Sequence, residues 1–586
     1  MPRIAVVEKD KCHPDQCGGQ PCMRFCPVNR GGEECITLPA GGKIVIDEEL
    51  CTGCGICPKK CPFGAIHIIN LPEELNQEPV HRFGQNEFRL YNLPTPVFGK
   101  VVGIIGRNGI GKSTAIKILA GVIKPNFGDW KRKDSSIDEL IEFFRGREAQ
   151  KYFEKVRDRE IKIAYKPQNI DRIPKNARGK VGELLKKVDE TGKFEEIAEM
   201  LDIKNILDND IEKLSGGELQ RVAIAATVLK KANVYIFDEP TSYLDIKQRI
   251  RVSRFIRNLA NESTAVLVVE HDLIILDYLT DIVHLMYGKE VCYGITSQPK
   301  PTRVGINVYL EGFLHEENVR FRPNQITFSR RAPVRLMDAE AVVSWDKISK
   351  TLGKFSLEAA EGSLKRKSVV GILGENGIGK STFLRILAGE EKGDEGSVGK
   401  GIQIAYKPQY IYTDSGELVA GFLGDALEKY DSQLIKPLEL RMLLTKKLNE
   451  LSGGELQRVM IAKTLSQDAK LYLLDEPSAY LDIEQRLVTS KLIRDFMEQS
   501  GKACLIVDHD LLLIDYLSDQ LMIFLGQPAI KGRVTGPFEM EKGMNLFLQG
   551  LDITLRRDAD SNRPRINKPE SQKDREQKSG GKLYYT

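Results

Sequence analysis

Short apolar runs recur along the chain and alternate with longer amphipathic segments. In the first half the runs are VVGIIG at 101–106, VYIFDE at 234–239 and AVLVVE at 265–270. Their length and their β-branched residues favour buried strands, whereas the intervening TAIKILAG and ELQRVAIAATVL favour helices. Strands that alternate with helices indicate an α/β fold.

The chain contains two copies of this pattern. Lys112 in GRNGIGKST and Lys380 in GENGIGKST are 268 residues apart, whereas Gln168 and Gln409, in the repeated YKPQ, are 241 apart. The first copy therefore carries about 27 extra residues between these two motifs. LSGGELQR and the Asp-Glu-Pro triplet also occur in both copies, which indicates two fused domains of one type.

The extra residues, at about 134–160, contain apolar positions at helical spacing. They predict two short helices, the first beginning after Ser135 or Ser136, in a basic projection. A solvated decoration without a partner is the alternative.

Charge is abundant but nearly balanced, with 86 Lys+Arg against 82 Asp+Glu among 586 residues. This balance excludes a protein that coats DNA, so any contact with nucleic acid must be local. MPRIAVVEKD has no apolar signal core, and charged residues interrupt the most apolar stretch, 503–525. We therefore expect a cytoplasmic protein without a membrane span.

Nine of the eleven cysteines lie within the first 61 residues, which indicates metal ligation. The CTGCGICPKKCP run has the spacing that binds a [4Fe–4S] cluster and sends its last cysteine to a second cluster. A stretched upstream run ends in the same Cys-Pro. This crossed rule assigns one cluster to Cys12, Cys17, Cys22 and Cys61, and the other to Cys51, Cys54, Cys57 and Cys26.

Zinc is the alternative metal, because it also accepts four thiolates at Cys-x2-Cys spacing. Two Cys-Pro endings in tandem favour paired clusters instead, and Cys35 is left as a non-ligand. The apolar KIVID and AIHIIN predict strands of a small ferredoxin-like α+β domain that ends near residue 75.

Each glycine-rich loop stands between a predicted strand and a predicted helix, where backbone N–H groups can surround phosphates. A lysine there supplies positive charge, and the next serine offers a hydroxyl to Mg²⁺. The expected residues are Gly106, Asn108, Gly109, Gly111, Lys112, Ser113 and Thr114, repeated as Gly374, Asn376, Gly377, Gly379, Lys380, Ser381 and Thr382.

Acidic residues end the next apolar strand, and a histidine follows the one after it. The first carboxylate suits a metal shell, the second can orient an attacking water, and the histidine reaches the same sheet edge to contact the γ-phosphate. The expected residues are Asp238, Glu239 and His271, repeated as Asp475, Glu476 and His509.

LSGGE introduces a further anion-binding helix N-terminus in each copy. Since each copy already has a phosphate loop, this helix is expected to serve the nucleotide of the other copy. The residues are Ser215, Gly216, Gly217 and Glu218, repeated as Ser452, Gly453, Gly454 and Glu455.

Together these motifs resemble the ABC-type ATPase family, whose two nucleotide-binding domains close head to tail around two ATP molecules. SYLD at 242–245 and AYLD at 479–482 are similar to its dimer-contacting loop. The resemblance implies two Mg²⁺ ions, contacted by Ser113, Gln168, Ser381 and Gln409. Differences such as Arg107 against Glu375 and Ser242 against Ala479 favour inequivalent sites. Phe83 and Phe355 are candidates for stacking on adenine, with Phe88, Tyr91 and Trp345 as alternatives.

Over essentially its whole length the chain resembles ABC subfamily E, the ribosome-recycling or RNase L inhibitor family. The implied fold is α/β, with two tandem ABC-type nucleotide-binding domains behind a ferredoxin-like α+β domain that holds two [4Fe–4S] clusters. The implied activity is ATP-driven splitting of ribosomes after termination or rescue, with the iron–sulfur domain as a lever. Implied partners of this monomer are the small ribosomal subunit and its rRNA, a class I release factor or its rescue paralogue, and, as further candidates, initiation factors.

The expected boundaries follow the repeats. They are 1–75 for the iron–sulfur domain, 76–300 and 346–527 for the ATPase domains, 301–345 and 528–568 for two hinges, and 569–586 for a flexible tail. Basic residues of the hinges can contact rRNA phosphates or, alternatively, pair with acidic neighbours. They are Arg320, Arg322, Arg330, Arg331 and Arg335, and Arg556, Arg557, Arg563, Arg565 and Lys568.

Two other functions fit parts of the sequence. A redox enzyme would use the clusters as electron carriers, and it predicts that cluster reduction changes ATP turnover. A DNA-repair ATPase would carry a long coiled coil between the halves of each core, and the sequence contains no such segment.

Overall fold

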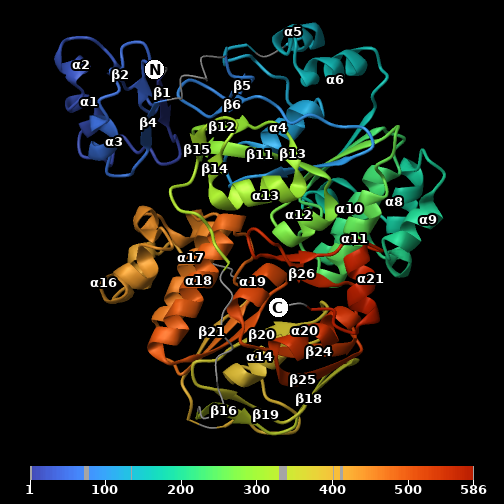
Figure 1. Cartoon of the computed structure of the whole chain (residues 1–586). Coiled ribbons are helices and arrows are strands. Elements are labelled where there is room, and N and C mark those ends of the chain that lie inside the picture. The colour runs from blue at the N-terminus through green and yellow to red at the C-terminus, as the bar shows by residue number, and fades with distance from the viewer. Residues whose placement is uncertain are drawn as a thin grey trace.

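The computed structural model describes residues 3–70, 78–132, 135–328, 340–399, 401–409 and 414–584. A small N-terminal domain lies beside two larger α/β domains, and the C-terminal segment lies near the junction between those two (Figure 1). Among the helices of the described residues, none has the length and apolar character needed to cross a lipid bilayer.

The N-terminal domain consists of two small antiparallel pairs and short helices, packed around cysteine side chains. Asn86 of the first α/β domain joins the two pairs, because its side chain donates to the carbonyls of Ala5 and Ile46 and accepts from the Ile46 amide. The elements are β1 (Arg3–Val7), α1 (Pro21–Arg24), α2 (Pro27–Arg30), β2 (Ile36–Thr37), β3 (Val45–Ile46), α3 (Ile56–Lys60) and β4 (Ile66–Asn70).

The first α/β domain is built on a nine-stranded sheet in the order β5-β6-β12-β11-β7-β10-β9-β8, with β13 beside β11. Its central strands are parallel and fully buried, as their continuous apolar runs predict. The strands are β5 (His81–Arg82), β6 (Arg89–Tyr91), β7 (Val101–Ile105), β8 (Ile163–Lys166), β9 (Val234–Asp238), β10 (Ala265–Val269), β11 (Ile282–Lys289), β12 (Tyr293–Thr296) and β13 (Lys300–Pro301).

The helices of this domain include the two in the expected insertion. Ser136 caps the first of these, α5, in a capping box with Glu139. The helices are α4 (Lys112–Leu119), α5 (Ile137–Phe143), α6 (Glu148–Arg157), α7 (Ile173–Asn176), α8 (Val181–Val188), α9 (Phe194–Met200), α10 (Gly216–Val228), α11 (Ile246–Arg257) and α12 (Leu273–Leu279).

The second α/β domain repeats this topology in an eight-stranded sheet, β17-β18-β25-β24-β20-β23-β22-β21. Because β25 belongs to the sheet, this domain extends past the boundary expected at residue 527. The strands of the sheet are β17 (Ile348–Leu352), β18 (Phe355–Ala359), β20 (Val369–Leu373), β21 (Ile404–Lys407), β22 (Leu471–Asp475), β23 (Ala503–Val507), β24 (Gln520–Gln527) and β25 (Lys531–Glu539). A separate antiparallel pair is formed by β16 (Ala341–Trp345) and β19 (Gly362–Lys365).

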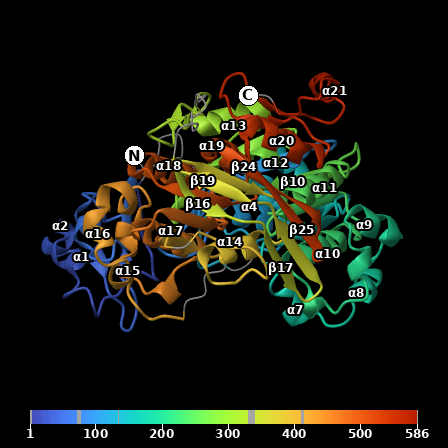
Figure 2. The same ribbon diagram turned by 90° about the horizontal axis from the view of Figure 1, so that it is seen from below.

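Gly64 of the N-terminal domain lies against Met442 of the second domain, and Figure 2 shows the N-terminal domain next to α15 and α16. The helices of the second domain are α14 (Lys380–Ala388), α15 (Val419–Leu423), α16 (Ala426–Lys429), α17 (Gly453–Ser466), α18 (Ile483–Ser500) and α19 (Leu511–Leu517).

The two hinges begin with equivalent helices and continue into small hairpins. They comprise α13 (Thr302–Glu311), β14 (Phe313–Leu314) and β15 (Val319–Arg320) in the first, and α20 (Met540–Gln549), β26 (Leu555–Arg557) and β27 (Pro564–Ile566) in the second.

Four of the six candidate hinge arginines within the described residues pair with carboxylates, so the alternative to rRNA contact holds for these four. Arg557 pairs with Asp515, and Arg563 and Arg565 both pair with Asp277. Arg322 pairs with Glu484, and Lys568 with Asp281. Arg330, Arg331 and Arg335 lie outside the described residues.

The C-terminal segment, expected to be flexible, is packed against the rest of the chain as far as Tyr584, the last described residue. Ser571 caps helix α21 (Gln572–Ser579), and Tyr584 is buried, with its hydroxyl donating to Asp515. The polar composition of the segment concealed this contact, because a single aromatic ring and one cap fix its position.

We predict that Tyr584→Ala lowers the free energy of unfolding by about 3 kcal/mol, because it removes a buried ring. Tyr584→Phe should cost about 1 kcal/mol, since only the hydroxyl bond is lost. Chemical denaturation of both variants measures the difference. Equal stability of Tyr584→Ala and the parent would contradict the packing of the tail.

Candidate nucleotide sites and cysteine centre

A cavity of 3240 Å³ separates the two α/β domains, and it brings both copies of the predicted motifs together. Both phosphate loops, both Ser-Gly-Gly segments, and the predicted glutamates, glutamines and histidines line it. The predicted residues that do not line it are Gly106, Gly374, Asp238, Asp475 and Phe355.

Two aspartates from the SYLD and AYLD loops fix the head-to-tail arrangement. Asp482 caps α18 through the Gln485 amide, and its other oxygen accepts the Asn108 amide of the opposite phosphate loop at 3.2 Å. Asp245 does the same with the Asn376 amide at 2.9 Å. Each phosphate loop is thereby attached to the other copy, next to the opposite Ser-Gly-Gly helix.

An ion pair accompanies each of these contacts, but its polarity differs between the copies. Arg107 contacts Glu484 at 3.3 Å, whereas the equivalent positions hold Glu375 and Lys247, 2.9 Å apart. Glu484 also pairs with the buried Arg322 of the first hinge. The two sites are therefore chemically inequivalent, as the sequence favours.

The glutamate after each buried strand is held by several groups at once. Glu239 accepts from the Gln168 amide at 2.6 Å and lies 3.3 Å from the His271 ring nitrogen. Burial alone would raise the pKa of Glu239, but His271 and Lys112 outweigh burial and lower it to about 2. The carboxylate is therefore ionised at neutral pH and suited to orienting a water molecule.

The second copy has the same arrangement with one hydrogen bond fewer. Glu476 accepts from Gln409 at 2.7 Å and lies 3.4 Å from His509. Ser242 donates to Glu239, but Ala479 at the equivalent position has no hydroxyl to donate to Glu476.

Backbone strain marks both glutamates, which have a φ of 47°. This left-handed conformation is costly for a residue with a side chain, so it requires support from the surroundings. Lys166 and Gln220 supply it by donating to the Glu239 carbonyl at 3.2 and 2.7 Å. Gln457 supports Glu476 in the same way.

Sequence reasoning did not single out these supporting residues. Lys166 belongs to the first YKPQ, and Gln220 and Gln457 to the repeated LSGGELQR. Lys407, the equivalent of Lys166, donates to the Asp475 carbonyl instead. Their repetition in the sequence could have marked them as functional. The carbonyl that each of them contacts is apparent only once the strands are paired.

The buried aspartates fit a magnesium ion. Both carboxylate oxygens of Asp238, and both of Asp475, are buried without a hydrogen-bond partner. Burial and the adjacent glutamate raise the pKa of Asp238, which a nearby cation would reverse. A cation bound between each aspartate and Ser113 or Ser381 would satisfy these oxygens and neutralise phosphate charge.

The two phosphate-loop lysines are buried and turn back onto their own loops. Lys112 donates to the carbonyls of Gly106 and Arg107, and Lys380 to those of Gly374 and Glu375. Burial lowers the pKa of Lys112, and it lowers that of Lys380 to about 8. Each lysine is thus a charge that an incoming phosphate would stabilise.

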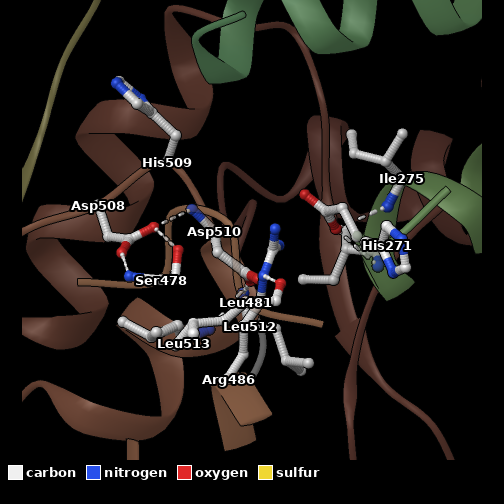
Figure 3. Close-up of polar contacts among 12 residues, drawn as sticks. His271, Ile275, Ser478, Leu481, Arg486, Asp508, His509, Asp510, Leu512 and Leu513 are labelled. Carbon is white, nitrogen blue, oxygen red and sulfur yellow. Dashed lines mark hydrogen bonds and ion pairs between the residues drawn. The ribbon is translucent and has the colours of Figure 1, made fainter. Parts of the chain in front are cut away.

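The histidine segments of the two copies lie close together at the domain junction (Figure 3). Asp508 is held by Ser478, and Asp510 caps α19 and pairs with Arg486 at 3.0 Å. Burial and the neighbouring Asp510 raise the pKa of Asp272 to about 6. The charge on one histidine segment therefore affects the protonation of the other.

The aromatic candidates differ between the copies. Phe88 of the first copy and Phe355 of the second lie against the equivalent glycines, Gly111 and Gly379. Phe83 lines the cavity, half exposed, with its ring centroid 6.3 Å from that of Phe88. Phe88 is therefore the structural equivalent of Phe355, and Phe83 is not.

None of the eleven cysteines, all of which lie in the described residues, forms a disulfide, and those of the N-terminal domain fall into two neighbourhoods. Burial and the nearby Cys61, Cys17 and Cys12 raise the pKa of Cys22 to about 11. Burial and the nearby Cys51, Cys54 and Cys26 raise the pKa of Cys57 to about 12. This is the grouping that the crossed assignment requires. Cys35 lies beside Cys26 and Cys51.

Two duplicated α/β domains that share a cavity between phosphate loops and opposing Ser-Gly-Gly helices define a tandem ABC-type ATPase. The family model for ABC transporters matches residues 97–242 and 357–479. A possible Fer4-like domain in RNase L inhibitor matches residues 2–34, and a 4Fe-4S binding domain matches 44–67.

Relatives that match over nearly their whole length identify the family more narrowly. An uncharacterized ABC transporter ATP-binding protein of Methanocaldococcus jannaschii is 50% identical over 100% of this chain and 97% of its own. Translation initiation factor RLI1 of Saccharomyces cerevisiae is 44% identical over 100% and 98%. A solved structure, a model of ribosome-bound archaeal Pelota and ABCE1, has a TM-score of 0.92 and 52% identity over 100% of this chain and 99% of that one. The chain belongs to ABC subfamily E, the RNase L inhibitor family, and is an ATPase with an iron–sulfur domain.

We predict that ATP affinity falls as the pH rises above about 8. Below that pH Lys380 carries its positive charge, whereas above it the nucleotide must bind together with a proton, which costs up to about tenfold per pH unit. Titration with a fluorescent, non-hydrolysable ATP analogue between about pH 7 and about pH 9.5 measures this slope.

Lys380→Arg is the matched control, because its guanidinium stays charged across this range. Its site should bind more weakly but show a flat profile above about pH 8. A flat profile in the parent chain would show that Lys380 does not titrate in this range.

Proposed function

We propose that this chain separates ribosomes into subunits after termination or rescue, using the closure of its two ATPase domains. One observation carries this proposal: the N-terminal domain shares a cavity with both nucleotide sites. His13, Lys43 and Phe63 lie on the wall of that cavity, as does Met442 of the second α/β domain. Closure of the cavity around ATP therefore requires the N-terminal domain to move.

In this proposal ATP joins the two domains and hydrolysis releases them. Lys112 and Lys380 bind the β- and γ-phosphates, and the opposing Ser-Gly-Gly helices complete each site. Asp238 and Asp475, with Ser113, Ser381, Gln168 and Gln409, hold two Mg²⁺ ions. Glu239 and Glu476 orient the attacking water, and His271 and His509 contact the γ-phosphate.

The two cysteine groups hold two [4Fe–4S] clusters, which stiffen a domain too small to be rigid through its apolar core alone. When bound, each cluster supplies four metal–thiolate bonds. The domain then moves as one body against a partner and acts as a lever.

The partners that we infer are the small ribosomal subunit with its rRNA, and a class I release factor or its rescue paralogue. Initiation factors are further candidates, and the chain acts as a cytoplasmic monomer. A relative with 52% identity was solved bound to a ribosome with Pelota. The exposed Arg147, Lys151 and Arg159 of the insertion offer charges for rRNA phosphates. By contrast, four of the six candidate hinge arginines within the described residues are engaged internally.

We predict that Glu239→Gln combined with Glu476→Gln traps the ATP-closed chain on the small subunit, because it removes both carboxylates that orient water. Turnover should fall by at least about a hundredfold. Sucrose-gradient sedimentation with ATP measures the trapped fraction. The exposed Glu262→Gln should behave like the parent. A double variant that sediments free of ribosomal particles would refute the proposal.

We also predict that Cys54→Ser preserves ATP binding but abolishes splitting, because it removes one cluster ligand from the lever domain. Absorbance of the clusters, nucleotide affinity and subunit splitting with release factor are measured on the same preparation. Cys35→Ala is the matched control and should keep both cluster absorbance and splitting. Normal splitting by a Cys54→Ser chain that has lost a cluster would exclude the lever role.

A further inference from the structure

Asp277 and Asp515 occupy equivalent positions in the two copies, six residues after His271 and His509. They lie on the short helices α12 and α19, which start directly after the histidine segments. Their side chains are only 3% and 2% exposed, so each carboxylate requires a partner.

The charged partners of both carboxylates come from one small element, the hinge-2 hairpin, residues 555–566, and Asp515 also accepts from the Tyr584 hydroxyl. Arg557 pairs with Asp515 at 2.8 Å. Two nitrogens of Arg565 donate to the two carboxylate oxygens of Asp277, at 2.6 and 2.9 Å. The fully buried Arg563 adds a third contact to Asp277 at 2.8 Å. A single hairpin therefore neutralises two equivalent carboxylates, one in each copy.

The pleat of the hairpin sends these arginines in opposite directions. Arg557 is paired with Pro564, whereas Arg556 is paired with Arg565. Residues opposite one another share a face and neighbours alternate, so Arg557 and Arg565 extend from opposite faces. The hairpin thus lies between α12 and α19, next to the junction of the two domains (Figure 1).

The loop of the hairpin is itself fixed. Asp558 accepts from the backbone amides of Asp560 and Ser561 and pairs with Arg565 at 3.0 Å. Arg303 of the first hinge pairs with Asp558 at 2.9 Å and with Asp560 at 2.7 Å. The contacts of Asp558 within the hairpin make it a stiff body, and the Arg303 pairs only attach that body to the first hinge.

We propose that the hinge-2 hairpin is a coupling element, in which Arg557, Arg563 and Arg565 transmit the state of one nucleotide site to the other. The inference rests on the proposed contact of His271 and His509 with ATP. A shift of either histidine segment moves its helix, and a buried ion pair cannot part without leaving a charge unpaired. The hairpin must therefore follow, and with it the opposite helix.

Arg249 of α11 forms a second connection between the histidine segments, because it pairs with Asp272 at 2.9 Å and donates to the His509 carbonyl at 3.4 Å. Loss of the hairpin contacts should therefore reduce the coupling without removing all of it.

The test is the coupling factor between the two sites, measured on the full-length chain by titration with a fluorescent, non-hydrolysable ATP analogue. Lys112→Ala blocks one site, and the affinity of the Lys380 site is compared with that in the parent chain. We expect a factor between about 5 and about 150 in the parent. In Asp515→Asn with Arg557→Gln, which removes both charges together, it should fall at least about threefold, with the affinity of the single site kept.

Arg303→Gln is the matched control, because it cuts a contact to the same hairpin but touches neither α12 nor α19. Its coupling factor should equal that of the parent. Arg557 contacts Asp515 through both terminal nitrogens, at 2.8 and 3.2 Å. Arg557→Lys keeps the charge but loses this two-nitrogen contact, so it should give an intermediate factor. It also replaces the double variant if that chain does not fold.

An unchanged factor in the double variant or, where that chain does not fold, in Arg557→Lys overturns the inference. So does a factor of one in the parent, or an equal fall in Arg303→Gln. Because only nucleotide binding is measured, failure here is distinct from failure of ribosome splitting. A chain that splits ribosomes but shows unaltered coupling would refute the hairpin's role alone.

Discussion

The structure depends on one constraint: a phosphate loop in either copy cannot form a complete site by itself. The helix that begins at each Ser-Gly-Gly points into the shared cavity, and the aspartates of the SYLD and AYLD loops attach each loop to the opposite copy. One carboxylate caps its own helix and holds the neighbour's loop with its second oxygen. The same aspartate therefore both caps its own helix and holds the two domains together.

Backbone strain is found where the chemistry is expected. Glu239 keeps a left-handed backbone because Lys166 and Gln220, from two other elements, hold its carbonyl, and Gln457 holds that of Glu476. The same glutamates accept from Gln168 and Gln409, which follow the neighbouring strand. Any change at the metal or phosphate would reach these glutamines directly, so the site and the insertion side of the sheet are mechanically connected.

Much of the fold and the motif chemistry could be predicted because it is local. A glycine-rich loop between strand and helix, or a serine before two glycines, needs no distant residue to be interpreted. The equivalence of Phe88 with Phe355 could not be predicted, because it depends on sheet register. Nor could the pairing of Arg565 with Asp277, separated by 288 residues. The polar composition of residues 569–586 predicted a flexible tail, yet the hydroxyl of Tyr584 donates to the buried Asp515.

The reversed ion pairs at the two nucleotide sites have a consequence for self-recognition. If two first domains from different chains were to pair, Arg107 would face Lys247, and two second domains would set Glu375 against Glu484. Like charges at both mismatched junctions oppose such exchange. The charges of the two domains are therefore complementary. Pairing of the two fused domains within one chain is favoured over pairing of two identical domains from different chains.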